Sequence, residues 1–204
     1  MNNPWEDINM EDYEKHMSLE SVFQLQAMNQ MMEEQFYTHP VKSIMILGVA
    51  GGNGLEHIDN HIIDKVYGID INENYLNECK KRYPELEGIL QTLCVDLTRD
   101  VKLPYADLLI ANLLIEYIGY ECFQKVVMQV NPKYVSCIIQ VNTNDSFVSD
   151  SPYIHVFDRL SEIHHLVEEK GLVEAMNKIG YKKDLHQERE LPNGKKLVRI
   201  DFIR

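Results

Sequence analysis

The chain lacks several features that would place it in a specialised class of protein. Its 204 residues contain no run of 18 apolar residues, so no transmembrane helix is expected. The first seven residues have neither the basic nor the apolar region of a secretory signal peptide. Lysine and arginine total only 20 against 32 aspartates and glutamates, a formal net charge of −12. A nucleic-acid partner is therefore disfavoured, because duplex-binding proteins carry a basic face.

Cysteine is scarce and poorly spaced for binding a metal. The four cysteines are scattered between positions 79 and 137, with no Cys-x-x-Cys pair. They fall mostly in apolar stretches, as buried thiols do in proteins of a reducing compartment. We expect a cytoplasmic protein with no membrane association and no metal site.

Segment 12–36 contains no glycine or proline and carries apolar residues at helical spacing. One long helix or two short ones are expected, ending at His39-Pro40 because proline restricts the residue before it. We expect an N-terminal helical lid at 1–40 and one globular domain at 41–204. The methionines at 28, 31 and 32 leave open a contact between two copies in a homodimer, since methionine-rich faces adapt to partners.

From residue 43 onward, strand-like and helix-like segments alternate. Strands are expected at 43–49, 66–69, 90–95, 107–111 and 134–141. Helices are expected at 55–61, 72–82, 120–130 and 162–179. This alternation predicts a parallel sheet with helices on both faces. The segment Leu191-Pro-Asn-Gly194 then separates two β-type runs, a strong hairpin signal. The expected fold class is α/β, with a Rossmann-like, seven-stranded, mostly parallel sheet whose last strand is antiparallel.

The junction between the first strand and a cluster of small residues is the most informative stretch. The apolar run Ile44–Val49 is followed by Ala50, Gly51, Gly52 and Gly54. Small residues let the backbone approach a ligand closely, and a helix that follows them offers unpaired N–H groups. This pattern predicts a nucleotide-type site.

Three further polar residues end later strands, where open α/β sheets bind their ligands. Asp70 is placed to accept hydrogen bonds from two ribose hydroxyls, and Asp96 to accept one from an adenine amine. Asn112 would lie at the floor of the crevice, near a transferred group. Taken singly, they could be a helix cap, a solvated carboxylate and a turn residue. Their joint placement favours a binding site.

With these residues, segment 42–204 resembles the class I S-adenosylmethionine-dependent methyltransferases. That family follows its first strand with an acidic residue, a variable residue and Gly-x-Gly-x-Gly. Here Ala50, Gly52 and Gly54 stand at the three glycine positions, and Gly48 stands at the acidic one. The resemblance therefore implies the loss of a carboxylate that helps to hold the methionine end of the cofactor. The residues that it assigns to the cofactor are Gly48, Ala50, Gly52, Gly54, Asp70, Ile71, Asp96, Leu97, Asn112 and Tyr13.

The resemblance implies an enzyme that moves a methyl group from S-adenosylmethionine to a small-molecule acceptor and leaves S-adenosylhomocysteine. The family has no universal catalytic residue, because positioning supplies much of the acceleration and only some acceptors must lose a proton. Glu116 and Tyr117 are candidates near the acceptor, or else a solvated carboxylate and a packing aromatic. The Asn-Pro-Pro-Tyr signature of many amide- and base-methylating relatives is absent, which disfavours those acceptors.

Two flanking segments are expected to contribute to the acceptor site. Tyr13 and Met17 of the N-terminal helix are predicted to face the cofactor or the acceptor. His155, His164 and His165 lie where the family commonly forms a substrate cap, although an isolated histidine is more often structural.

Three other functions stay open at this point. One is a protein or RNA methyltransferase, of which the acidic charge disfavours the RNA enzyme. Another is an NAD-dependent oxidoreductase, whose Gly-x-Gly-x-x-Gly spacing does not match the loop. The third is a catalytically degenerate adenosyl-binding module, favoured by the missing acid at Gly48.

Overall fold

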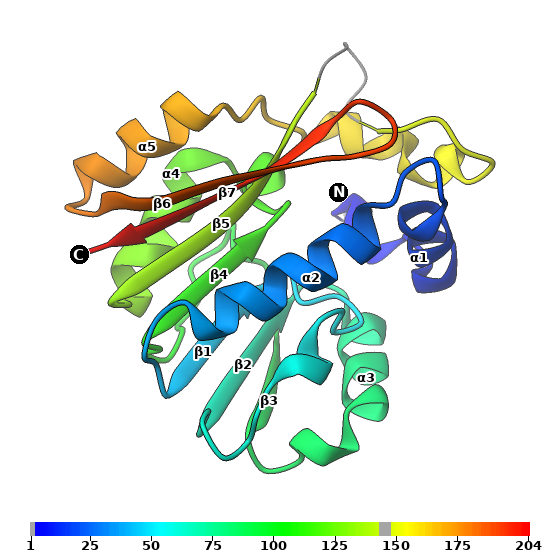
Figure 1. Cartoon of the computed structure of the whole chain (residues 1–204). Coiled ribbons are helices and arrows are strands. Elements are labelled where there is room, and N and C mark those ends of the chain that lie inside the picture. Colours follow the sequence, from blue (N-terminus) through cyan, green and yellow to red (C-terminus); the bar gives the residue numbers. More distant parts are fainter. Residues whose placement is uncertain (1–2, 143–147) are drawn as a thin grey trace.

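The computed structural model describes residues 3–142 and 148–204, which form a single seven-stranded sheet covered by helices (Figure 1). The strand order is β3-β2-β1-β4-β5-β7-β6, so the order reverses between β1 and β4. Strands β1 to β5 pair in parallel, and β7 runs antiparallel to both of its neighbours. The predicted fold class is confirmed. The strands are β1 (Ser43–Leu47), β2 (Lys65–Asp70), β3 (Leu90–Cys94), β4 (Leu108–Asn112), β5 (Tyr134–Val141), β6 (Lys182–Glu190) and β7 (Lys196–Ile203).

Helices cover both faces of the sheet because successive strand residues point to opposite sides. Ile44 and Ile46 of β1 pack in a core layer with α2 and α3, whereas Met45 and Leu47 pack in the layer of α4 and α5. The helices are α1 (Met10–Ser18), α2 (Gln24–Tyr37), α3 (Glu73–Arg82), α4 (Ile115–Val130) and α5 (Glu169–Lys178). Short 3₁₀ segments are η1 (Pro4–Glu6), η2 (Leu55–His57), η3 (Pro84–Leu86) and η4 (Ile154–Glu162). None of the helices in the described parts of the chain is long and apolar enough to cross a membrane.

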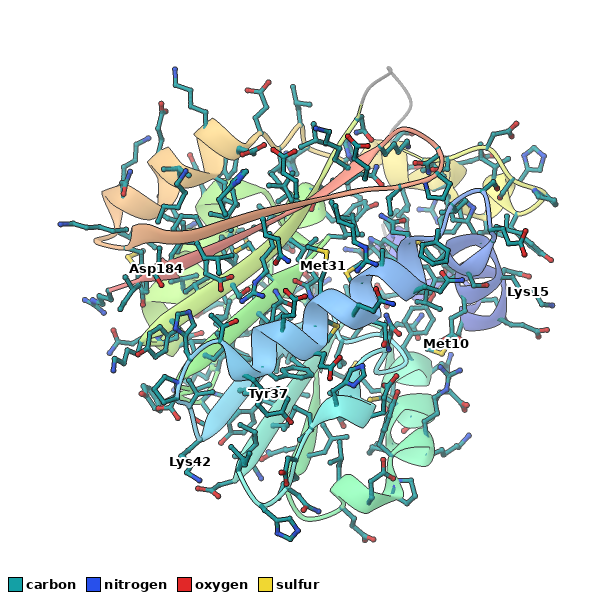
Figure 2. All side chains as sticks on the ribbon, in the orientation of Figure 1. Met10, Lys15, Met31, Tyr37, Lys42 and Asp184 are labelled. Atoms are coloured by element: carbon teal, nitrogen blue, oxygen red, sulfur yellow. The ribbon has the colours of Figure 1, made fainter. Side chains whose placement is uncertain are left out.

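The N-terminal segment forms two separate helices, which lie at different places relative to the sheet. α1 ends at Ser18, and Phe23 adopts the left-handed region (φ 53°) before α2 begins. The break lets α2 lie along the sheet while α1 lies beyond the strand ends (Figure 1). Met31 of α2 is buried (1% exposed), whereas Tyr37 at the end of the same helix is 43% exposed (Figure 2). The methionines at 28, 31 and 32 are all buried within this one chain.

The prediction of a helix at 55–61 is wrong. The segment 48–54, called the glycine loop from here on, continues into the single 3₁₀ turn η2. α2 packs closely on this part of the face, since a Cβ on Gly54 would lie 3.0 Å from Met32 Cβ. Asp59 then accepts a hydrogen bond from the His61 N–H (2.8 Å), a turn that competes with helix. The helix expected at 162–179 is shorter, since α5 starts at residue 169. The helix expected at 120–130 matches the part of α4 that follows a non-helical break at Gly119 (φ 72°).

A chain of buried hydrogen bonds crosses from the last strand to the end of β4. Arg199 and Asp201 of β7 form an ion pair (Nη2–Oδ2, 2.5 Å) and are 1% and 0% exposed. Ser136 of β5 donates to Asp201 Oδ1 (2.5 Å) and accepts from Gln35 Nε2 of α2 (2.7 Å). The Gln35 amide also exchanges two hydrogen bonds with the Asn112 amide, at 3.0 and 2.9 Å.

Candidate functional site

A cavity of about 160 Å³ lies at the carboxyl ends of the parallel strands, at the point where the strand order reverses. The N-terminal segment and the segment 148–167 form its other walls. The residues predicted from the sequence that line it are Tyr13, Met17, Gly48, Ala50, Asp70, Ile71, Asp96, Leu97, Asn112, Glu116, Tyr117 and His164. The fold thus brings most of the predicted site into one place.

Asp70, the last residue of β2, ties the glycine loop to the start of α3. Its Oδ2 accepts the Ala50 N–H and its Oδ1 accepts the Asn72 N–H, each at 2.9 Å. Asn72 in turn caps α3, as predicted, by accepting the N–H groups of Asn74 and Tyr75. Burial raises the pKa of the Asp70 carboxyl, although the N–H donors act in the opposite direction. Each carboxylate oxygen has a second lone pair, so Asp70 retains capacity for ligand hydroxyls.

The four loop residues that the resemblance assigns to the cofactor divide into two pairs. Gly48 and Ala50 line the cavity, with φ of 68° and 47°. Gly52 and Gly54 do not line it. A Cβ on Gly52 would lie 2.7 Å from the Tyr83 ring, and Gly54 lies against α2. These two glycines let the loop pack tightly between α2 and α3.

Gly48 stands where class I methyltransferases have an acidic residue. Both its backbone conformation and its neighbour Leu114 restrict which residue can replace it. Its φ of +68° strains any other residue, and an added Cβ would lie 3.2 Å from Leu114 Cδ1. Gly48→Ala is expected to lower the free energy of unfolding by about 1–2 kcal/mol or more, measured by chemical denaturation. Gly88→Ala is the matched control, because Gly88 has a φ of +94° and nothing within 4 Å of its added Cβ. A loss at Gly48 no larger than at Gly88 would show that Leu114 imposes no constraint.

Asp96 and Asn112 are both engaged with protein groups at the rim and floor of the cavity. Asp96 Oδ1 accepts the Thr98 N–H (2.9 Å) and hydroxyl (2.6 Å), and Oδ2 pairs with Arg99 Nε (3.1 Å). The side-chain amide of Asn112 is held by Gln35 of α2. Both residues are therefore fixed in place before any ligand binds.

Glu116 is the only acidic side chain among the described residues that combines near-complete burial with a place in the cavity wall. It is 6% exposed, and Oε1 accepts the Gln140 N–H at 3.1 Å. Oε2 is buried and has no hydrogen-bond partner among the described residues. Burial raises the pKa of this carboxyl to about 7. A carboxyl with a pKa near neutrality is suited to accept a proton at physiological pH.

Aromatic rings from the N-terminal segment and from α3 and α4 meet at the cavity. Trp5 lies edge-on to Tyr117 (ring centroids 5.0 Å apart) and to Tyr13 (5.9 Å). Tyr13 stacks on Tyr75 of α3 (6.1 Å). The Trp5 carbonyl accepts a hydrogen bond from Asn72 Nδ2 (3.0 Å), which fixes this segment to the end of β2.

Unpartnered polar atoms are concentrated at this cavity. The described part of the chain has five buried polar side-chain atoms without a hydrogen-bond partner. Three of them, Trp5 Nε1, Tyr75 Oη and Glu116 Oε2, belong to residues that line the cavity. Buried polar groups in native proteins are normally paired, so these three atoms make the cavity a candidate site for a polar ligand.

The three histidines predicted for the cap separate in the structure. His164 lines the cavity and has its pKa lowered by burial, whereas His155 and His165 are not in the wall. The sequence did not single out Gln24 or Gln140, whose side chains meet there (Nε2–Oε1, 2.9 Å). Gln140 follows a buried run near the carboxyl end of β5, the same signal that identified Asp70.

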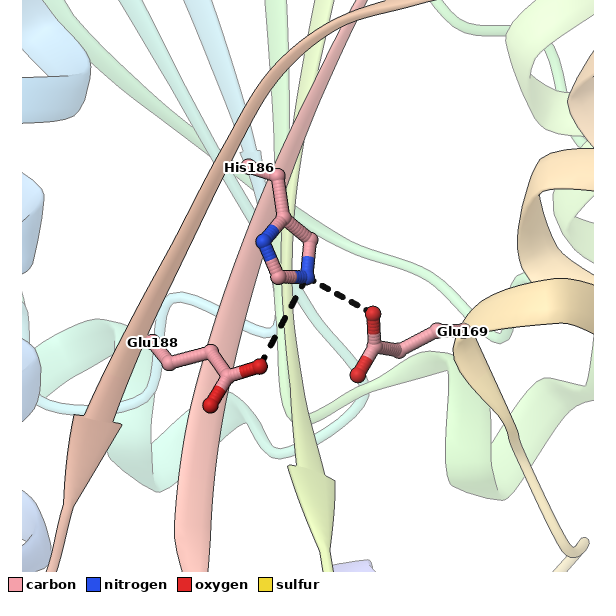
Figure 3. Close-up of side chains that lie close together, drawn as sticks. All are labelled: Glu169, His186 and Glu188. Atoms are coloured by element: carbon pink, nitrogen blue, oxygen red, sulfur yellow. Dashed lines mark hydrogen bonds and ion pairs between the residues drawn. The ribbon is translucent and has the colours of Figure 1, made fainter.

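One group of possible metal ligands occurs among the residues that the structure describes (Figure 3). None of its three members lines the cavity. Glu169 of α5 accepts from His186 Nε2 of β6 at 2.7 Å, and Glu188 lies 4.0 Å from the same nitrogen. Lys196 Nζ contacts Glu188 Oε2 at 3.0 Å. Since this ammonium already balances the carboxylate, we interpret the group as a surface ion-pair network.

Several solved structures with the same fold are methyltransferases. Neither a protein-family model nor a curated protein matches the sequence. The methyltransferase domain of bacterial CtHen1 superposes with a TM-score of 0.67 at 18% identity, covering 87% of this chain and 97% of that one. The N-methyltransferase NodS from Bradyrhizobium japonicum WM9, in complex with S-adenosylhomocysteine, gives 0.67 at 9%, covering 94% and 95%.

A third similar structure has a different activity in its name. The [4+2]-cyclase SpnF superposes with a TM-score of 0.66 at 10% identity, covering 87% of this chain and 80% of that one. At such identities the similarity establishes the fold, the Rossmann-like fold of class I methyltransferases, and the function has to be argued from the site.

Proposed function

We propose that this chain, which has the class I methyltransferase fold, is an S-adenosylmethionine-dependent methyltransferase that acts on a small-molecule acceptor. The observation that carries the proposal is the cavity at the reversal point of the sheet, where Asp70 meets the glycine loop. Three buried polar atoms there have no hydrogen-bond partner among the described residues. Similar structures bind S-adenosylmethionine or S-adenosylhomocysteine. When bound, S-adenosylmethionine supplies a methyl group activated by a sulfonium.

The cavity residues fit the parts of this cofactor. We assign the two ribose hydroxyls to the Asp70 carboxylate, which lies at the end of β2. The adenine would contact Asp96 with the apolar walls of Ile71 and Leu97. The methionine end would lie over Gly48 and Ala50, where the backbone can approach closely.

Asp70→Ala is expected to weaken binding of S-adenosylhomocysteine at least tenfold, about 1.4 kcal/mol, because the ribose loses its acceptor. Isothermal titration calorimetry on the full chain measures the dissociation constant. The control is Asp64→Ala, which removes an exposed carboxylate (68%) whose Lys42 partner lies 4.0 Å away. Unchanged affinity in a folded Asp70→Ala variant would refute the ribose assignment, and binding of NAD in place of both adenosyl compounds would refute the proposed function.

The N-terminal lid is proposed to consist of residues 3–18, with α2 belonging to the sheet core. Two ion pairs help to attach α1 and η1: Asp7 pairs with Arg159 of η4 (2.7 Å), and Glu14 pairs with Arg82 of α3. The hydrogen bond between the Trp5 carbonyl and Asn72 is a further attachment. The cavity of about 160 Å³ is smaller than pockets that hold drug-sized ligands, and we propose that this segment moves outward when the cofactor enters. Enclosure between the lid and η4 favours a small acceptor over a protein or an RNA.

A further inference from the structure

We infer that the methyl acceptor is an amine, and that its ammonium group binds the buried carboxylate of Glu116. The inference rests on the proposed methyl transfer and deepens it by naming the acceptor class. The inference is based on the Glu116 carboxylate, which is 6% exposed and lines the cavity. One of its oxygens has no hydrogen-bond partner among the described residues.

The position of Glu116 separates it from the adenosine half of the site. Asp70 ends β2, whereas Glu116 accepts the N–H of Gln140 at the end of β5. β1 and β4 lie between these strands, so the two carboxylates are about three strand spacings, roughly 14 Å, apart along the sheet. A cofactor whose ribose is at Asp70 and whose methionine end is over β1 leaves the β4–β5 side of the cavity for the acceptor.

The charge of Glu116 selects among acceptors. A buried carboxylate without a full set of partners is costly, and a protonated amine supplies both the opposite charge and a hydrogen-bond donor. An alcohol of the same shape supplies only a neutral donor, and a carboxylate acceptor would be repelled. The net charge of −12 favours the approach of a cation as well.

Aromatic rings that line the same cavity as the carboxylate add to this selection. Tyr117, next to Glu116 on α4, lies between Trp5 (5.0 Å) and His164 (6.0 Å between ring centroids). The electron-rich faces of such rings attract cations and pack well against an apolar substituent. The acceptor that fits is a small amine with an apolar or aromatic side.

The carboxylate must also accept a proton, because an ammonium has no lone pair with which to attack the methyl carbon. The bound ammonium first gives one proton to Glu116 Oε2, which leaves a neutral amine. The amine lone pair then forms the N–C bond to the methyl carbon while the electron pair of the S–C bond stays on sulfur. The products are an N-methylammonium ion, S-adenosylhomocysteine and the protonated Glu116, which returns its proton to solvent.

Binding to the full chain saturated with S-adenosylhomocysteine tests this inference without relying on turnover. The probes are two matched pairs, 2-phenylethylamine with 2-phenylethanol and hexylamine with 1-hexanol, titrated by calorimetry. At least one amine is expected to bind tenfold or more tightly than its alcohol. Glu116→Gln is expected to remove this preference and leave the dissociation constant of S-adenosylhomocysteine within twofold. Glu121→Gln, an exposed position on the same helix, is expected to change neither.

Each other outcome is decisive. Equal binding of amines and alcohols, or no binding of either amine to a protein that binds S-adenosylhomocysteine, overturns the inference and leaves the proposed function standing. A tenfold loss of S-adenosylhomocysteine affinity in Glu116→Gln also overturns it, because the carboxylate would then hold the ammonium of the cofactor. A chain that fails to bind S-adenosylhomocysteine overturns the proposed function itself, and the inference with it.

Discussion

Asp201→Ala is expected to lower the free energy of unfolding by about 3–5 kcal/mol, the usual cost of breaking a buried ion pair. The reason is that Arg199 would remain buried, 1% exposed, after losing a partner that now binds it at Nε (2.9 Å) and Nη2 (2.5 Å). Ser136 would lose its acceptor in the same step. Chemical denaturation followed by circular dichroism gives the free energy.

The double variant Arg199→Met with Asp201→Leu separates an unpaired charge from a general packing defect. Removing both charges and refilling the space is expected to recover most of the stability, since buried ion pairs gain little over well-packed apolar residues. Glu34, 3.7 Å from Arg199 Nη1 and half exposed, is too solvated to replace Asp201. A loss below 1 kcal/mol in Asp201→Ala would mean that Arg199 escapes to solvent, and that the buried pair is not required.

Glu116→Gln is expected to stabilise the folded chain at pH 8 by about 1–3 kcal/mol, an effect in the direction opposite to most substitutions. The folded-state pKa of Glu116, about 7, is raised above the value of 4.5 in the unfolded chain. The folded state therefore binds more protons between these values, and wild-type stability falls as the pH rises from 4.5 to 7. Glutamine has no charge to bury, so the variant avoids this loss.

The pH dependence of the difference identifies its source. The two proteins should be equally stable near pH 4.5 and diverge up to pH 7, with a constant difference above it. Asp70 titrates in both proteins, so its contribution cancels in the difference. Glu121→Gln, exposed on the same helix, serves as the control and should show no such divergence. A difference independent of pH would mean that the Glu116 carboxyl is not protonated in the fold at neutral pH.

Local sequence signals were sufficient to predict most strands of the sheet. They were insufficient where tertiary packing determines the local structure. The apolar runs gave the five parallel strands, and Asn72 and the Asn-Gly pair gave a helix cap and a hairpin. The segment after the glycine loop looked helical by spacing, yet α2 packs tightly against it and only η2 forms. No pattern inside residues 55–61 indicates that α2, which begins at residue 24, packs against them.

The same distinction holds for the candidate site. Asp70, Asp96 and Asn112 could be predicted because a parallel sheet brings its strand ends together. The pairing of Asn112 with Gln35 could not, since it joins β4 to a helix 77 residues away. Trp5 of η1 and Gln24 at the start of α2 line the cavity because of tertiary packing, which local spacing does not report.

The place of β7 in the sheet makes the order of synthesis matter. β7 comes last in the chain, yet it lies between β5 and β6 and pairs with both. Until residues 196–203 have been made, β5 has an open apolar edge, and the Asp201 end of the hydrogen-bond chain to Asn112 is missing. A growing chain therefore cannot complete the floor of its cavity early, and truncated products that lack β7 should be prone to aggregate.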